Sequence, residues 1–350
     1  MTRAALAAPG VLSRDEVAAT TAGILAIQRP DGAIPWFHGD KLDPWDHVES
    51  AMALDAADEH AAARRAYRWL AGRQNPDGSW FANYADGPDG AGPATDPTKD
   101  ANFSAYVAVG AYHHYLSTGD RETAEELWPC VERAIGFVLG LQRPDGAIRW
   151  NTGTGEALLT GSSSIFHAVR CALALAGLLG RDAPDWEWAA AALGTAVAGH
   201  PERFSPKDRY SMDWYYPVLS TAVRGRAADD RIDGSWSRFV VPGLGVRCVD
   251  DHPWVTGGET CELALALAVT GRETEARTLL ADIQHLRNPA DGLYWTGYVY
   301  ADTAIWPEEL TSWTAGSMLL ALGALGGDRA TVAVFGGADL PVVRAAEVNA

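Results

Sequence analysis

One short phrase recurs along the chain and limits the folds it can adopt. It reads LQRPDGAIRW at 141–150, IQRPDGAIPW at 27–36 and, in a shorter form, RQNPDGSW at 73–80. Proline fixes φ, the aspartate caps its own turn and the glycine accepts positive φ, so each copy reverses the chain after a helix. Counting the degenerate copies IDGSW and NPADGLYW, turns are predicted at Asp31, Asp77, Asp145, Asp233 and Asp291. The chain is therefore expected to consist of repeated helical units.

A second set of helices lies between these turns. Each begins after a cluster of polar residues and is apolar nearly all round, with starts spaced roughly 45 to 60 residues apart, the period of a repeated helical hairpin. The segments are 46–57, 102–116, 162–179, 211–223, 258–269 and 309–325. The stretches before the turns, such as 63–74 and 131–142, also have apolar residues at helical spacing. Six helical hairpins are predicted.

Six such hairpins favour an all-α fold of the (α/α)6 toroid type, with residues 1–350 as a single domain. Helices that are apolar on every side need neighbours on every side, which a closed double ring provides. An open solenoid of the same hairpins is the alternative. In a closed ring the loops before the inner helices meet at one mouth, and the long irregular stretches 83–102 and 151–164 belong there. Loops of that length in a compact domain are usually either functional or disordered.

Charge and composition exclude several partners. The formal net charge is −17 and Lys and Arg form no cluster, so neither nucleic acid nor an anionic membrane is expected as a partner. No apolar run approaches the roughly 20 residues of a membrane span, which predicts a cytoplasmic protein without a span. Four cysteines without a C-x-x-C pair are expected to be reduced core thiols. The oligomeric state is left open.

The repeats also resemble a known family. The stretch RAYRWLAGRQNPDGSW matches the QW repeat of squalene and oxidosqualene cyclases, and a second copy matches until its aromatic residue, which arrives two places late at Trp150. The matching positions are Arg65, Ala66, Trp69, Leu70, Gln74, Gly78 and Trp80, then Arg133, Ala134, Phe137, Val138, Gln142 and Gly146. The resemblance implies the α–α toroid that terpenoid cyclases share with the catalytic subunits of protein prenyltransferases.

The chain departs from that family at its functional motifs. Class II cyclases carry D-x-D-D, whereas CVDDHPW at 248–254 has Cys248 in place of the first aspartate. Prenyltransferases carry a D-x-C zinc-ligand pair, but here Glu259 and Cys261 have no evident histidine partner. No metal site and no cofactor are therefore predicted. IWPEELTSW at 305–313 loosely resembles the W-E-E stretch of glucoamylase-type glycosidases, a second group of six-hairpin toroids.

Carboxyl groups at the starts of the inner helices are the candidate catalysts. Helix capping explains Asp46, but Glu49 lies one turn into an apolar helix, where an unpaired buried carboxylate is costly. Two facing carboxyl groups in different environments provide the acid and the base of glycoside hydrolysis. The predicted catalytic residues are Glu49, Asp213 and Glu309, then Glu308, and Asp251 if the cyclase resemblance is taken literally.

Aromatic and polar residues near the same helix starts are the candidate substrate-binding residues. An aromatic face beside an acid suits both a sugar ring and a carbocation. The set is His47, Trp45, His167, Trp214, Tyr215, Tyr216, Trp254, Glu259, Trp306 and Trp313. The mixed polar mouth favours a glycoside hydrolase acting on an oligosaccharide. The alternatives are a terpenoid cyclase or prenyl-transferring enzyme acting on an isoprenoid, and a non-catalytic toroid that binds a glycan or a protein.

Overall fold

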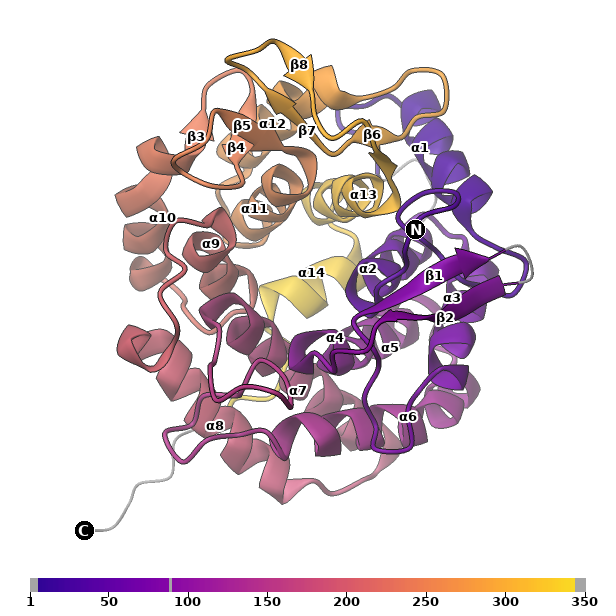
Figure 1. Cartoon of the computed structure of the whole chain (residues 1–350), viewed down its shortest axis with the longest axis vertical. Coiled ribbons are helices and arrows are strands. Elements are labelled where there is room, and N and C mark those ends of the chain that lie inside the picture. The colour runs from indigo at the N-terminus through magenta and orange to yellow at the C-terminus, as the bar shows by residue number, and fades with distance from the viewer. Residues whose placement is uncertain (1–5, 88–89, 344–350) are drawn as a thin grey trace.

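The computed structural model, which describes residues 6–87 and 90–343, has the predicted all-α toroid (Figure 1). The inner helices pack on one another in the order α2, α5, α7, α9, α11, α13 and back to α2. Their bounds are α2 Pro44–Ala56, α4 Ala101–Ala105 continued by α5 Val107–Thr118, α7 Leu159–Leu179, α9 Ser211–Leu219, α11 Gly257–Val269 and α13 Ser312–Gly326. The ring is closed, which excludes the open solenoid.

An outer ring of helices surrounds the inner one. It consists of α1 Arg14–Ile27, α3 His60–Gly72, α6 Arg121–Leu139, α8 Pro184–Gly199, α10 Arg226–Phe239 and α12 Glu273–Asp282. The last helix, α14 (Arg329–Gly336), follows the end of α13 through Gly327 and packs on α5, α11 and α13. It lies across the centre of the ring (Figure 1). One end of the inner barrel is therefore closed by α14, and the mouth lies at the end where the inner helices begin.

The repeated phrase fastens neighbouring outer helices together. The Gln74 side-chain amide donates to the Gly78 carbonyl at 3.0 Å and to the Cys130 carbonyl of α6 at 2.9 Å, while Arg133 donates back to Gln74. Gly78 has φ +92°, and a Cβ there would lie 2.2 Å from the Arg133 carbonyl oxygen. Glycine is therefore required by both the turn and the close approach. The repeated phrase therefore ends one outer helix and also joins it to the next outer helix by hydrogen bonds.

The last copy of the phrase closes the outer ring. Thr20 on α1 donates its hydroxyl to the Gly292 carbonyl at 2.8 Å, which joins the turn after α12 to the first helix. The predicted turn at Asp233 is wrong, because Asp233 and Gly234 lie inside α10. That copy has no proline before Asp-Gly, so nothing there stops a helix.

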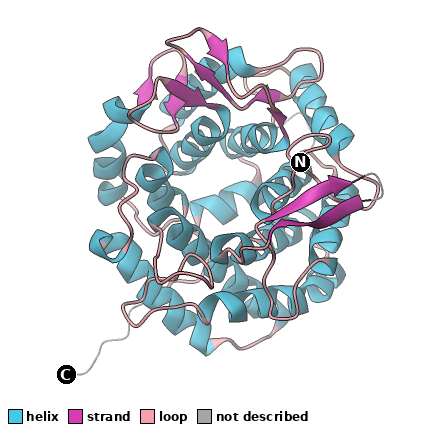
Figure 2. Cartoon of the chain, viewed as in Figure 1, coloured by secondary structure: helices cyan, strands magenta, loops and turns pink. Residues whose placement is uncertain are grey.

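Short strands line the mouth (Figure 2). A two-stranded hairpin occupies much of the predicted irregular stretch 83–102, a five-stranded antiparallel sheet has the order β3-β4-β5-β7-β8, and β6 pairs with β9. The bounds are β1 Asn83–Gly87, β2 Gly90–Asp96, β3 Val240–Val241, β4 Gly245–Arg247, β5 Trp254–Thr256, β6 Tyr294–Trp295, β7 Gly297–Val299, β8 Ala304–Ile305 and β9 Leu310–Thr311. Most are too short for alternation to reveal them in the sequence.

One inner helix is longer and more apolar than the sequence pattern indicated. Helix α7 has 21 residues and a mean hydropathy of 1.4, enough in length and composition to span a membrane, but 83% of that stretch is buried inside the toroid. Helices α13 and α14 pass the same criterion only as a pair bent by 97°. Burial by neighbouring helices accounts for the apolar character of α7.

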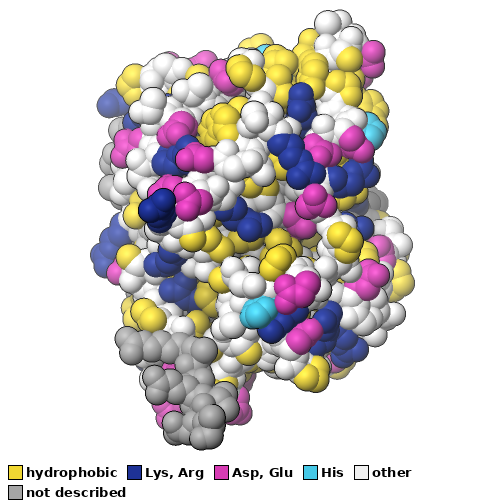
Figure 3. Space-filling model, turned by 90° about the vertical axis from the view of Figure 1, so that its left-hand side faces the viewer, with side chains coloured by type: hydrophobic (Ala, Val, Ile, Leu, Met, Phe, Trp, Pro, Cys, Tyr) yellow, Lys and Arg dark blue, Asp and Glu magenta, His cyan; other side chains and the backbone are white. Residues whose placement is uncertain are grey.

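On the outer face in Figure 3, basic and acidic side chains are intermixed.

Candidate active site

Three carboxyl groups are buried together near the mouth. Asp46 and Glu49 lie on α2 and Glu262 lies on α11, and they are 8%, 2% and 1% exposed. Helices α2 and α11 flank α13, on which both pack. Burial raises the pKa of all three, and their like charges raise the pKa of Asp46 and Glu262 further. The cluster therefore retains a proton near neutral pH.

Among the described residues, no group of three or more His, Cys, Asp and Glu side chains has an arrangement that could hold a metal ion.

Asp43 caps α2 and adds to the effect of burial on the pKa of Asp46. Asp43 is the N-cap of α2, and its carboxylate accepts from the backbone N–H of Asp46 at 2.9 Å and from the Trp36 indole at 2.6 Å. Burial, the charge of Asp43 and a side-chain hydrogen bond with Asp43 together raise the pKa of Asp46 well above its ordinary value. Asp43, and not Asp46, therefore caps the helix.

Glu49 is buried against α13. Burial raises the pKa of Glu49 to about 7. The Ser317 hydroxyl oxygen lies 2.9 Å from Glu49 Oε1 and 2.9 Å from the Trp313 carbonyl. The hydrogen bond from Ser317 lowers the pKa of Glu49, but burial outweighs it. The indoles of Trp45 and Trp313 lie close enough to lower the pKa of Glu49, although neither N–H makes a hydrogen bond of normal geometry.

Glu262 accepts a hydrogen bond from a tyrosine. The Tyr215 hydroxyl donates to Glu262 Oε2. Burial and the charges of Glu49 and Glu259 raise the pKa of Glu262, whereas the bond from Tyr215 lowers it. The hydrogen bond from Tyr215 therefore reduces the rise in pKa that burial and the neighbouring charges cause, and the pKa stays well above its ordinary value.

A pocket of about 360 Å³ opens beside the cluster. It is lined by Trp45, Asp100, Asn102, Phe103, Trp150, Leu158, Thr160, Gly161, Lys207, Tyr210, Met212 and Asp213. Trp45 connects the pocket to the cluster, because it lines the pocket and its indole lies close enough to Glu49 to lower the pKa of that residue. Its ring packs on Tyr216 at 5.5 Å and on Tyr106 at 5.4 Å. We call this space the mouth pocket.

Several predicted site residues lie at the mouth pocket or the acid cluster. Asp213 lines the pocket and accepts from the Thr160 hydroxyl at 2.6 Å. Glu259 is buried in the first turn of α11, with Oε2 lacking a hydrogen-bond partner among the described residues. The others in this group are Trp45, Glu49, Tyr215, Tyr216 and Trp313.

Glu308 and Glu309 lie elsewhere. They line a separate pocket of about 340 Å³, whose lining has no residue in common with the mouth pocket. Helix α13 begins at Ser312, capped by Thr311, so both glutamates precede the helix that was expected to carry them into the ring. The resemblance of this stretch to a glucoamylase-type acid is not supported by its position.

Asp251 is unsuited to proton donation. It is paired with Arg209 at 2.6 Å and His252 at 2.8 Å on the surface. Hydrogen bonds from Arg209 and His252 lower its pKa to about 2. Its neighbour Asp250 is held by Arg238. A cyclase-type acid therefore has no counterpart at this loop, because an ionised, exposed carboxylate has no proton to give.

The two predicted histidines and Trp214 serve packing. His47 uses both ring nitrogens on backbone groups, Nδ1 accepting from Ile34 and Nε2 bonding to the Ala66 carbonyl. His167 bonds to the Val334 carbonyl of α14, at the closed end. Burial lowers the pKa of both histidines to about 4.

Trp214 faces the outer ring. Its indole donates to the Arg231 carbonyl and its ring stacks on Phe239, 5.3 Å away, both on α10. Trp254 on β5 and Trp306, directly after β8, form an edge-to-face pair 5.1 Å apart, and Trp306 is 57% exposed. This pair remains available to a ligand, whereas Trp214 is enclosed by protein.

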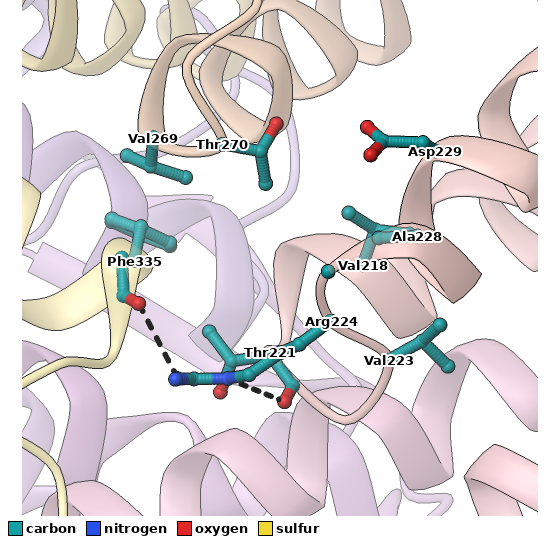
Figure 4. A pocket seen from close by; sticks show the side chains of 11 residues that line it. Val218, Thr221, Val223, Arg224, Ala228, Asp229, Val269, Thr270 and Phe335 are labelled. Atoms are coloured by element: carbon teal, nitrogen blue, oxygen red, sulfur yellow. Dashed lines mark hydrogen bonds between the residues drawn. The ribbon is translucent and has the colours of Figure 1, made fainter.

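A further pocket of about 260 Å³ opens near α14, at the opposite end (Figure 4). Its walls are Val218, Val223, Val269 and Phe335, among others. Arg224 donates there to the backbone carbonyls of Thr221 and Gly336, so its guanidinium ties loop ends together. Asp229 is the one carboxyl group among its lining residues. The pocket therefore has no pair of acids.

Asp46 and Glu262 are members of the cluster that were not among the predicted catalytic residues. Asp46 was assigned to capping, which Asp43 performs instead. Glu262 carries the same signal as Glu49, a carboxyl group one turn into an apolar helix, three residues after Glu259 in GETCELALALAV. Applying that criterion to every inner helix would have found it.

Comparisons with known proteins agree with this geometry. No family model matches the chain. The MMP endo-(1,4)-3-O-methyl-alpha-D-mannosidase of Mycolicibacterium hassiacum is 51% identical over 337 residues, which cover 95% of this chain and 92% of the relative.

Solved structures show the same fold at low identity. A glycosidase variant in complex with glucose has a TM-score of 0.68 at 18% identity, covering 89% of this chain and 96% of its own. A GH63 mannosylglycerate hydrolase from Thermus thermophilus has a TM-score of 0.66 at 13% identity, covering 88% of this chain and 99% of its own. The chain belongs to the family of the endo-mannosidase and is an enzyme of the glycoside hydrolase type.

Proposed function

We propose that the toroid acts as a single domain that hydrolyses internal (1,4) linkages between 3-O-methyl-α-D-mannose residues. The substrate class comes from the relative, whose sequence this chain matches over nearly its whole length. The observation that carries the proposal is the buried group of Asp46, Glu49 and Glu262 beside the mouth pocket. Incubation with oligosaccharides of this type, with unmethylated mannosides and prenyl diphosphates in parallel, tests it. Cleavage of prenyl diphosphates alone would reject it.

Asp46 is proposed as the general acid and Glu262 as the general base or nucleophile. Glycoside hydrolysis needs one carboxylic acid to protonate the leaving oxygen and one carboxylate to activate water or attack the sugar. Asp46 is the most exposed of the three acids, follows a wall residue of the mouth pocket, and has its proton favoured by Asp43. Glu262 approaches from α11 and accepts from Tyr215. The acid and the base are therefore carried by two different inner helices, one on either side of α13.

Glu49 is proposed to hold the pKa of Asp46 high. The charge of Glu49 is one of the causes that raise the pKa of Asp46. Glu49→Gln removes that charge, so the pKa of Asp46 falls and the acid loses its proton at lower pH. The alkaline limb of kcat/KM against pH is expected to move to lower pH, measured with a fixed oligosaccharide. Glu309→Gln, in the separate pocket, is the matched control and leaves the limb in place. An unmoved limb in Glu49→Gln contradicts this role.

Trp306 is proposed to bind a distal sugar of a long substrate. Its ring is 57% exposed and is held by Trp254, whose indole donates to the Trp306 carbonyl at 2.8 Å. Trp306→Ala is expected to raise KM about tenfold for long oligosaccharides, the order expected for one aromatic contact, with kcat unchanged. Trp188→Ala removes a ring that is 61% exposed on outer helix α8 and should have no effect. Equal KM values in the two variants would rule the contact out.

A further inference from the structure

The wall of the mouth pocket is largely apolar although it adjoins an acid cluster. Phe103 on α4, Leu158 at the start of α7 and Met212 on α9 come from three different inner helices. Phe103 packs edge-to-face on Trp45, with ring centroids 5.9 Å apart. An unmodified hexose carries hydroxyl groups around its ring, and a hydroxyl buried against such a wall loses its hydrogen bonds to water without replacement.

Polar side chains line the same pocket. Asn102 is 5% exposed and its Oδ1 has no hydrogen-bond partner among the described residues, although it lines the pocket. Asp213 lines the same space, buried and bonded to Thr160. An amide oxygen and a carboxylate are acceptors, which suit the O–H donors of a sugar. The pocket therefore offers acceptors for hydroxyl groups as well as apolar side chains for an apolar substituent.

We propose that Phe103, Leu158 and Met212 bind the methyl ether of the substrate, and that this contact makes the enzyme prefer 3-O-methylated to unmethylated mannosides. The inference rests on the proposed function, since it concerns the same site. Methylation replaces an O–H donor by an apolar group that the wall can cover. Burial of one methyl group corresponds to about a fourfold preference, and the avoided loss of a hydroxyl hydrogen bond adds to it.

The test compares two oligosaccharides of equal length, one of (1,4)-linked 3-O-methyl-α-D-mannose and one of (1,4)-linked α-D-mannose. The ratio of their kcat/KM values is measured for wild type and two variants. Met212→Gln nearly keeps the side-chain volume and adds a polar group. Leu158→Asn is expected to fold, because Leu158 is the N-cap of α7 and makes no side-chain capping hydrogen bond. Asn is a favoured residue at the N-cap position. Each variant is expected to lower the ratio about fivefold, mainly by losing the methylated substrate.

Val332→Gln is the matched control, since Val332 is 38% exposed on α14 at the closed end. It is expected to keep the wild-type ratio. If wild type cleaves both substrates and both pocket variants keep that ratio, the inference is overturned while the proposed function stands.

Binding separates the inference from catalysis. If neither oligosaccharide is cleaved, calorimetric titration with the same two oligosaccharides measures their affinities for wild type, Met212→Gln and Leu158→Asn. A preference for the methylated probe that the pocket variants lose supports the methyl-binding wall and rejects the proposed hydrolysis. Equal binding of both probes overturns the inference and leaves the substrate class without support.

Discussion

Glu262→Gln is expected to lower kcat about a thousandfold, within the range lost when a general acid or base is removed. Glutamine keeps the shape and can still accept from Tyr215, so the buried hydrogen bond survives. What it loses is the basic oxygen that would activate water or attack the sugar. KM is expected to stay within about a factor of two, because the change affects the transition state rather than ground-state binding. Release of reducing ends from the methylated oligosaccharide measures the effect.

Asp46→Asn is expected to give a loss of similar size, since it removes the proposed proton donor. Glu308→Gln is the matched control, an acid-to-amide change in the separate pocket, and should retain wild-type kcat. A Glu262→Gln enzyme that keeps more than a tenth of wild-type turnover would show that the base lies elsewhere. Glu49 would then be the next carboxyl group to examine, because it belongs to the same cluster.

The ring architecture was predictable because its determinants are local. Each Pro-Asp-Gly turn ends one helix. The Gln and Gly of the same phrase contact the backbone of the next outer helix, so one local sequence determines both the hairpin and the position of the neighbouring helix. The failure at Asp233 follows the same logic, since the copy without proline continues as helix. The short strands at the mouth depend on pairing between distant segments, such as Trp254 with Val299, which no local pattern reveals.

The site was only partly predictable because the inner helices are buried on every side. All the residues of α2 are buried, so composition cannot tell side chains that face the hollow from those that face the outer ring. Glu49 faces Ser317 of α13, whereas His47, two residues earlier, faces α3. The direction in which each side chain of α2 points is set by how the helices pack when the ring closes. Glu309 was misplaced for a different reason, a helix boundary three residues too early, which is a common error at helix ends.

A second buried carboxyl group, at the other end of α2, has a structural role. Asp55 accepts from His114 Nδ1 at 2.9 Å and lies 3.0 Å from His60 Nδ1, and the Tyr67 hydroxyl lies 3.5 Å away. These partners come from α5 and α3, so Asp55 ties an inner hairpin to its neighbour. Despite burial, which raises it, the pKa of Asp55 is lowered overall by hydrogen bonds from His114 and His60.

Asp55→Asn is expected to lower the free energy of unfolding by about 3 kcal/mol, the cost of removing one partner from a buried charged pair. Urea unfolding followed by circular dichroism measures it. Asp251→Asn, which removes an exposed carboxylate paired with Arg209, is the control and should have no measurable effect.

The difference between wild type and Asp55→Asn should depend on pH in a defined direction. The pKa of Asp55 is lowered from 3.8, so its contribution is present above about pH 4 and is lost as the pH falls through the folded-state pKa. The pKa of His60 is raised from 6.5 by its bond to Asp55, so its contribution is complete below about pH 6.5 and is lost as the pH rises through the raised value. The difference should therefore be largest between these limits. A difference that stays constant from about pH 3 to about pH 9 would mean that Asp55 acts through its shape alone, because only an ionising group makes a contribution that changes with pH.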